Sequence, residues 1–317
     1  MFFSLESESE MAQKFSLKNA EQVRNNLTMQ QQKKIRKLYS DLYQDITKQI
    51  NKLGQKNLKT QNLVILRRNI NERIKQLSND IKNGIVIDMR TQSIAVVEDC
   101  RTFLKQCGFQ NIHEAFQYVP EQIIENIYTG NVYQNGWTFS KAIWRMEEQN
   151  RGKINTIVSK GVAQGKSAYE VAKDVEKYVD PSASKQSKTI KWTNPKTGKT
   201  ETFYFGKVDY NAQRLARTLI SHAYQQSFKR VNEKDPFVTA YIWHSAGIHG
   251  RTCDLCLDRD GRVFAKDALP DDHPNGMCTF EAYIPYTMNE IGDKIADWYN
   301  SPVGTYPDID AYAEDFM

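Results

Sequence analysis

The residues best suited to metal chemistry lie together in one segment, residues 249–278. This segment contains three of the five cysteines and two of the five histidines of the chain. Its first two cysteines form a Cys-x-x-Cys pair, which brings two sulfurs within reach of one ion. A hairpin turn at Asp260-Gly261 can return the chain so that a histidine and a third cysteine complete a tetrahedral set. We therefore predict one structural Zn²⁺ ion bound by Cys253, Cys256, His273 and Cys278.

Two other roles are open to the Cys-x-x-Cys pair, a redox couple or two unliganded buried cysteines. A redox pair normally opens a helix in a βαβ unit. Here the pair follows the strand-like residues 238–243 and precedes an Asp-Gly turn, so structural zinc is favoured. A catalytic zinc is disfavoured because four protein ligands leave no open position for water. Two further histidines are reserve ligands, His244 and His249.

The same residues resemble the C-terminal signature of tailed-phage minor head proteins, the head-morphogenesis or Mu F-like family. The resemblance rests on Arg251-Thr-Cys-Asp-Leu-Cys, Asp260-Gly-Arg-Val-Phe and His273-Pro-Asn-Gly-Met-Cys. Two upstream segments, Arg214–Thr218 and Gly161–Ala172, are similar to earlier parts of the family's sequence. The likeness covers residues 140–286, and its C-terminal motif is the more specific part.

The chain departs from the family's pattern at two positions. The family commonly has His-Pro-x-Cys-x-Cys, and Gly276 stands here in the place of the first of those cysteines. Leu219 follows Arg217-Thr218, where the family often has an acidic residue. Because many members lack the cysteines altogether, the metal is an addition to the family's role and not the role itself.

The resemblance implies a structural, non-enzymatic protein of the phage head that is associated with the portal vertex and the packaged DNA. It would act in procapsid assembly and in genome packaging or delivery. The implied partners are the portal protein, scaffold or major capsid protein, and double-stranded DNA bound without sequence preference, with no membrane. The expected location is the virion, in the head interior or at the portal vertex, after assembly in the host cytoplasm.

The main alternative is a zinc-dependent endonuclease similar to the ββα-metal enzymes, in which a histidine activates water and a following helix supplies further ligands. Asp272-His273-Pro274 after a Cys-x-x-Cys hairpin fits the start of such a site. The residues after Cys278 instead alternate like a strand and end in Pro285. We therefore predict that the chain is not an enzyme and has no catalytic residue.

Composition limits the classes of protein that remain. At 317 residues, with 40% hydrophobic and 26% charged residues, the chain can form two folding units with a core. No apolar run approaches the about 18 residues of a membrane helix, and the first residues lack the features of a signal peptide. The grouped cysteines fit a reducing compartment better than a disulfide framework.

Charge is distributed unevenly along the chain. Residues 14–83 contain 16 Lys or Arg against 5 Asp or Glu, and residues 290–317 contain 7 acidic residues against one lysine. The basic segment can bind DNA phosphates without reading bases, although a solvated helical face would have the same composition. The predicted phosphate contacts are Lys33, Lys34, Arg36, Lys37, Arg67, Arg68 and Arg73.

The pattern of apolar residues predicts an α+β chain with a mostly helical N-terminal region. Apolar spacings of three and four over residues 20–83 predict two amphipathic helices, folded as a hairpin about Gly54 or as an extended arm, with a stop at Gly84. More helices are predicted over residues 91–107, from Pro120, and over 140–165, 167–179, 209–232 and 288–299. Alternating residues predict strands over 238–245 and 279–285.

We divide the chain into three parts on this basis. The first is a helical N-terminal region, residues 1–137, and the second is a Mu F-like domain, residues 138–286. The second part contains a basic β-hairpin insertion, residues 182–207, and a small α+β module with a zinc-knuckle-like β-hairpin, residues 238–286. The third part is a C-terminal helix with an acidic tail, residues 287–317.

Overall fold

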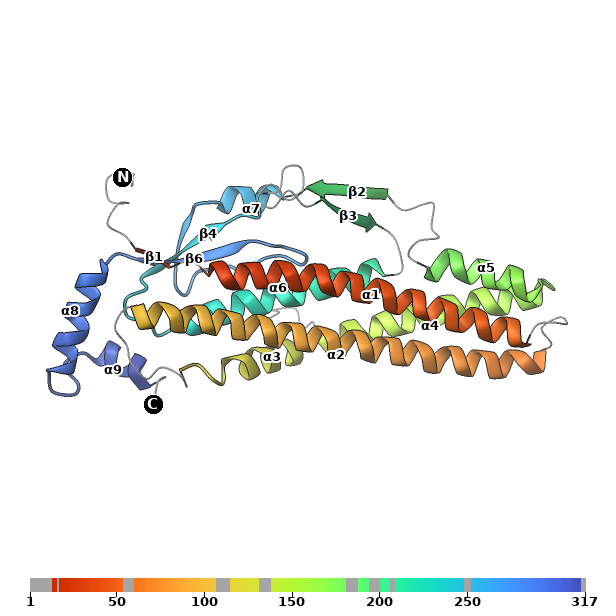
Figure 1. Ribbon diagram of the computed structural model, residues 1–317, viewed down its shortest axis with the longest axis horizontal. Coiled ribbons are helices and arrows are strands. Elements are labelled where there is room, and N and C mark those ends of the chain that lie inside the picture. The colour runs from red at the N-terminus through yellow and green to blue at the C-terminus, as the bar shows by residue number, and fades with distance from the viewer. Residues whose placement is uncertain are drawn as a thin grey trace. The chain divides into compact units, whose positions relative to one another are not determined.

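The computed structural model describes residues 13–15, 17–53, 60–106, 115–130, 138–180, 188–193, 200–205, 209–247 and 252–314 (Figure 1). Its helices are α1 (Lys18–Leu53), α2 (Thr60–Gln106), α3 (Val119–Thr129), α4 (Phe139–Ala163), α5 (Ala168–Val179), α6 (Tyr210–Asn232), α7 (Asp254–Arg259), α8 (Met288–Tyr299) and α9 (Pro307–Ala313). Its strands are β1 (Gln13–Phe15), β2 (Lys188–Thr193), β3 (Thr200–Phe205), β4 (Ala240–His244), β5 (Val263–Ala265) and β6 (Thr279–Ile284). Among the described helices, none combines the length and apolar character that a membrane span requires.

The predicted fold class is confirmed: long helices precede a small antiparallel sheet that carries a Cys/His cluster. The predicted stop at Gly84 is wrong, because α2 continues through this residue to Gln106. A methyl group at position 84 would lie 2.8 Å from the side-chain nitrogen of Gln31 on α1. The glycine therefore lies against the end of the Gln31 side chain inside a continuous helix and is not a helix end, although glycine inside a helix costs about 1 kcal/mol relative to alanine.

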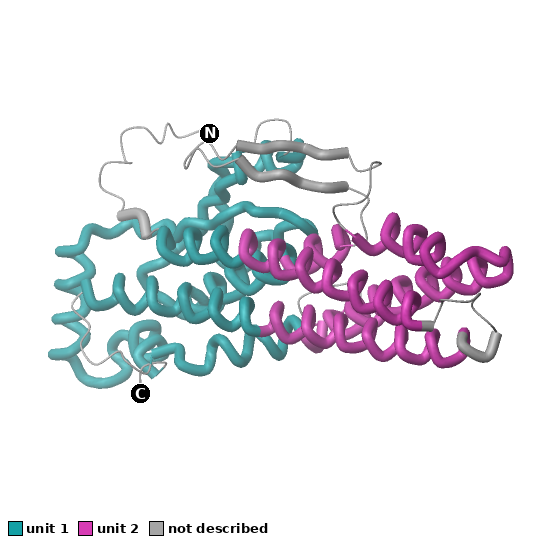
Figure 2. The backbone as a smooth tube through the Cα atoms, turned by 45° about the vertical axis from the view of Figure 1, so that its right-hand side comes forward, with its two compact units in different colours: residues 1–27, 87–127, 217–317 teal, residues 28–86, 128–216 magenta. Residues whose placement is uncertain are grey.

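The chain forms two compact units, and each is assembled from segments that are distant in sequence (Figure 2). Unit 1 comprises residues 1–27, 87–127 and 217–317, and unit 2 comprises residues 28–86 and 128–216. The long helices α1 and α2, and also α6, contribute residues to both units.

Unit 2 is built mainly from the apolar stripes of its helices. Most of the predicted stripe positions of α1 and α2 are buried, among them Ile35, Leu42, Ile46, Ile70 and Ile74, whereas Leu38 and Leu63 are half-buried. The turn into α5 is closed by the predicted capping box, in which Ser167 and Glu170 hydrogen-bond reciprocally, and Gly165 takes a positive φ of 69° just before it. A polar contact crosses this core, where the side-chain amide of Asn150 on α4 donates to the hydroxyl of Tyr39 on α1 at 2.9 Å.

The four-stranded sheet of unit 1 has the order β1-β6-β4-β5, with every neighbouring pair antiparallel. Buried and less buried residues alternate along β4 and β6, as the sequence pattern predicts. Phe228 of α6 contacts both Tyr241 and Phe280, with ring centroids 5.2 and 5.9 Å away, so α6 covers the apolar face of the sheet. This packing fixes the start of β6, where the last of the clustered cysteines lies.

The turn at Asp260-Gly261 is present, but it leads from α7 into β5 and does not join two strands directly. Gly261 has a positive φ of 74°, and its amide donates to the carbonyl of Trp243 at 2.8 Å. β5 pairs with β4 from Ala240–Ala265 to Ile242–Val263. The inserted helix α7 therefore lies beside the sheet and carries the Cys-x-x-Cys pair.

The predicted basic hairpin is confirmed at the level of the backbone, since β2 and β3 pair antiparallel from Lys188–Phe205 to Thr193–Thr200. The turn between them, residues 194–199, lies outside the described residues. The acidic C-terminal segment contains a helix, α9, that the sequence pattern did not predict. Its Asp310 accepts a hydrogen bond from the indole of Trp298 on α8 at 2.7 Å.

Replacing Tyr39 with Phe should lower the free energy of unfolding by about 1–3 kcal/mol, because the buried amide of Asn150 then loses its acceptor. Urea unfolding monitored by circular dichroism measures this change. Tyr43→Phe, at a half-buried position on the same helix, is the matched control and should change stability by less than about 0.5 kcal/mol. Equal stabilities of the two variants would contradict a structural role for the Tyr39–Asn150 contact.

Candidate metal centre

The Cys-x-x-Cys pair is positioned by the first turn of α7. Cys253 is the N-cap residue, with extended backbone, and its carbonyl accepts the amides of Cys256 and Leu257 at 3.0 Å each. Because the pair brackets one helical turn, both sulfurs lie on the same side of the helix. Cys256 is buried and Cys253 is exposed, so the pair reaches from the core to the surface.

A tight turn positions the histidine. The amide of Gly276 donates to the carbonyl of His273 at 2.9 Å, which closes a four-residue turn. Pro274 occupies the second position of this turn, and Asn275 occupies the third with a positive φ of 70°. These are the residue types that a type II turn prefers at those positions. This turn therefore directs the chain back to Cys278, the residue directly before β6.

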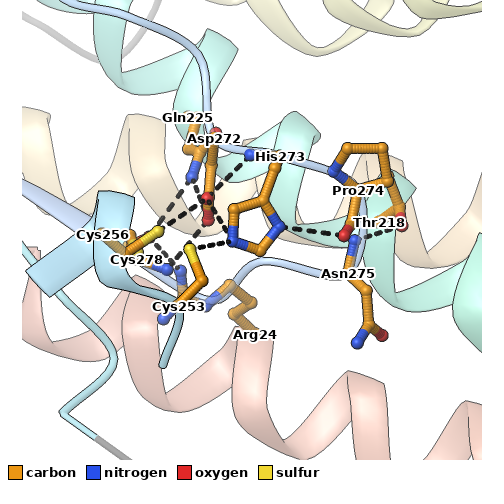
Figure 3. Close-up of polar contacts among 10 residues, drawn as sticks. All are labelled: Arg24, Thr218, Gln225, Cys253, Cys256, Asp272, His273, Pro274, Asn275 and Cys278. Carbon is orange, nitrogen blue, oxygen red and sulfur yellow. Dashed lines mark hydrogen bonds and ion pairs between the residues drawn. The ribbon is translucent and has the colours of Figure 1, made fainter. Parts of the chain in front are cut away.

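The four predicted ligand residues come together in the fold (Figure 3). The sulfur of Cys253 lies 3.3 Å from Nε2 of His273. The donor atoms of Cys253, Cys256 and His273 all lie within 4.8 Å of one another, and so do those of Cys256, Asp272 and Cys278. Ligands of a tetrahedral zinc lie roughly 3.5–3.8 Å apart, given metal–ligand distances of about 2.0–2.3 Å. The group could therefore hold a metal ion with small movements of its side chains.

Of the two reserve histidines, the structure describes only His244, which is not a member of the donor group. Nε2 of His244 lies 2.8 Å from a carboxylate oxygen of Glu281, across the β4–β6 pair. This hydrogen bond raises the pKa of His244 despite its partial burial. His249 lies outside the described residues.

Asp272 is a residue of this site that sequence reasoning did not assign. Its side chain is buried, and one carboxylate oxygen accepts the amide of His273 at 2.8 Å. The other oxygen accepts the amide of Cys278 at 3.0 Å. The thiol of Cys256 also points toward this carboxylate, with its sulfur 3.8 Å from the nearer oxygen. One buried side chain thus fixes the backbone of two predicted ligands.

The structure gives a reason for glycine at position 276 that the sequence alone does not supply. A methyl group at this position would overlap the carboxylate of Asp272. The space that any side chain at position 276 would need is therefore taken by the carboxylate. Gly276 therefore accompanies a buried acid four residues earlier, Asp272.

Helix α6 supports the turn from one side. The guanidinium of Arg217 donates to the side-chain oxygen of Asn275 at 3.0 Å, and the hydroxyl of Thr218 accepts the Asn275 amide at 2.8 Å. Further along the helix, Gln225 donates to the carbonyl of Cys278 at 3.3 Å. Two segments that were singled out separately in the sequence, Arg214–Thr218 and the His-Pro-Asn turn, therefore contact each other.

Helix α1 supports the same loop through Arg24. This side chain is 3% exposed, and its guanidinium donates to the carbonyls of Cys278 and Met277 at 3.0 and 3.2 Å. The guanidinium also lies 4.7 Å from the ring centroid of Tyr224, a cation–π distance. An N-terminal residue is thus a buried part of the C-terminal cluster.

The protonation of the cluster differs from one thiol to the next. Burial raises the pKa of Cys278 to about 11, with the negative charge of Asp272 adding to the effect. Burial likewise raises the pKa of Cys256. Burial also acts on Cys253, but hydrogen bonds from Cys256 and the charge of His273 outweigh it, so the pKa of Cys253 is lowered. A bound ion would have to displace the protons of the two buried thiols, so affinity should rise with pH.

The seven predicted DNA contacts lie on the unit 2 parts of α1 and α2, but they are not equivalent. Three of them are paired with carboxylates: Lys37 with Asp41 at 2.9 Å, Arg36 with Asp209 at 3.8 Å, and Arg73 with Asp45. Within the described part of the chain, four form no ion pair with a carboxylate: Lys33, Lys34, Arg67 and Arg68. Contact with DNA stays a prediction.

Comparison with known proteins gives no assignment. No family model, no curated protein and no solved structure matches the chain. The interpretation of the cluster therefore depends on its own geometry, and the resemblance to the Mu F-like family stays a prediction.

Replacing Asp272 with Asn should weaken metal binding by roughly 10–100-fold, because the amide group can accept only one of the two backbone amides that the carboxylate now accepts. Competition for Co²⁺ or Zn²⁺ with a chromophoric chelator measures this affinity. Asp271→Asn is the matched control, since the exposed Asp271 contacts Lys229 and Gln226 and lies outside the donor group. Affinities of the Asp272 variant and wild type that agree within about twofold would contradict the positioning role.

Proposed function

We propose that the chain is a structural minor head protein of a tailed phage, associated with the portal vertex and the packaged DNA. The observation that carries this proposal is the contact between two segments of the resemblance. Arg217 and Thr218 hold the His273–Gly276 turn, so segments separated by more than fifty positions form one structural unit. Contact between its separate segments is expected of a sequence signature that specifies how a chain folds.

The metal in this proposal is a structural Zn²⁺ ion held by Cys253, Cys256, His273 and Cys278. Three thiolates and an imidazole are typical donors for tetrahedral zinc in structural sites. Asp272 would remain a buried partner of the backbone amides and orient two of the ligand residues. Such a site stabilises the loop between β5 and β6, since a structural zinc contributes folding free energy.

The strand after the cluster supports a non-enzymatic role. Strand β6 begins directly after Cys278, at the place where a ββα-metal nuclease would have its ligand-bearing helix. Four protein donors also fill a tetrahedral ion and leave no position for a reacting water. The partners in this proposal are portal protein, scaffold or major capsid protein, and duplex DNA.

Purified full-length protein should contain about one zinc per chain when it is prepared under reducing conditions. The Cys253→Ser, Cys278→Ser double variant should lose that zinc, and residues 252–284 should lose hydrogen-exchange protection, because metal binding is coupled to local folding. Cys100→Ala, which removes a buried cysteine of α2 outside the donor group, is the control and should retain the metal. Elemental analysis decides the outcome. A zinc-free wild type, or full retention by the double variant, would contradict the proposed ion.

The proposed role is tested in the phage itself. Mass spectrometry of purified virions should detect this chain at low copy number together with the portal protein, and cross-linking should join the two. The genome supplies an independent check, because a portal gene is expected next to the gene for this chain. Absence of the chain from both virions and procapsids, in preparations that contain portal protein, would rule the role out.

A further inference from the structure

Unit 2 contains a groove of about 750 Å³ that runs between α2 and α4. Arg67 of α2 and two residues of α4, Arg151 and Lys160, line it with positive charge. Its one acidic lining residue, Glu148, forms an ion pair with Arg151. Three cations against one paired carboxylate leave the groove positively charged.

The rest of the lining suits an oxygen-rich anion. Ser159 contributes a hydroxyl group, whereas the hydroxyl of Thr156 donates to the carbonyl of Gly152. The lining also contains the paired amides of Asn155 and Asn71, with a hydrogen bond of 2.8 Å between them. Hydroxyl and amide groups donate readily to phosphate oxygens, and they position a nucleic acid without reading its bases. No large apolar side chain contributes to the lining that the structure describes.

The length of the groove favours a polymer over a single phosphate. Its lining extends along α4 from Glu148 to Ala163, which is about 22 Å at 1.5 Å per residue. Duplex DNA advances about 3.4 Å along its axis per base pair, so this length corresponds to about six base pairs of duplex. Arg67 and Lys160 are exposed, and neither forms an ion pair with a carboxylate within the described residues.

We propose that the groove between α2 and α4 binds the phosphate backbone of double-stranded DNA through Arg67, Arg151 and Lys160. This inference rests on the DNA contact in the proposed function and names the surface that makes it. It changes the predicted set, because Arg151 and Lys160 line the groove and enter the set, while Arg36, Lys37 and Arg73 do not line it. Binding would be independent of sequence and strongly dependent on salt.

The test compares two variants of equal net charge in the full-length protein. Arg67→Gln, Lys160→Gln removes two cations of the groove. Lys48→Gln, Lys153→Gln removes two exposed cations of unit 2 that do not line it. The affinity for a duplex of 20 base pairs is measured by fluorescence anisotropy from 50 to 200 mM salt.

The groove variant should show a salt slope shallower by about 2, so that it loses about tenfold less affinity than wild type over this salt range. The control should keep the wild-type slope to within about 0.5. Equal slopes for the two variants would overturn the groove while leaving DNA as a partner. A wild type that does not bind duplex at 50 mM salt would overturn both the groove and the DNA contact.

A second arm separates the polymer from free phosphate. Millimolar inorganic phosphate or deoxyadenosine monophosphate should neither displace the duplex nor raise the melting temperature of the wild type. Displacement by either at that concentration, abolished in the Arg67→Gln, Lys160→Gln variant, would overturn the assignment to a polymer. The portal test is independent of both arms, since a chain absent from virions could still bind DNA through this groove.

Discussion

The carboxylate of Asp272 is the interaction on which the C-terminal cluster depends. It is buried, and it accepts the backbone amides of His273 and Cys278 with its two oxygens. A buried carboxylate is costly unless its oxygens are hydrogen-bonded, so the loop must keep both amides in place. The absence of a side chain at Gly276 leaves the room that this arrangement needs. The distances among the thiols and the imidazole depend on that constraint.

The cluster is also connected to helices that are distant in sequence. Arg24 of α1 donates to the carbonyls beside Cys278, and Arg217 of α6 donates to Asn275. A metal ion bound here would therefore stabilise contacts to the start of α1 as well as the loop itself. Because burial raises the pKa of Cys256 and of Cys278, acid should favour the protonated thiols and release of the ion.

Local patterns predicted much of this fold. The stripes of α1 and α2, the capping box at Ser167 and the alternation along β6 depend on residues close in sequence. The structure confirms the capping box, the alternation and most positions of the stripes. The four candidate ligands were also grouped from type and spacing. Long-range contacts were not predictable in this way. The helix α2 continues through Gly84, which lies against the Gln31 side chain, β1 pairs with β6, and Asp272 accepts backbone amides. None of these contacts leaves a periodic pattern.

X-ray absorption at the zinc edge tests the central claim most directly, because it reports the atoms bound to the ion in the intact protein. The account predicts three sulfur ligands at about 2.3 Å and one nitrogen at about 2.0–2.1 Å, with four ligands in total. This signature would correspond to Cys253, Cys256, Cys278 and His273. A first shell with two or fewer sulfurs, or one dominated by oxygen, would contradict it.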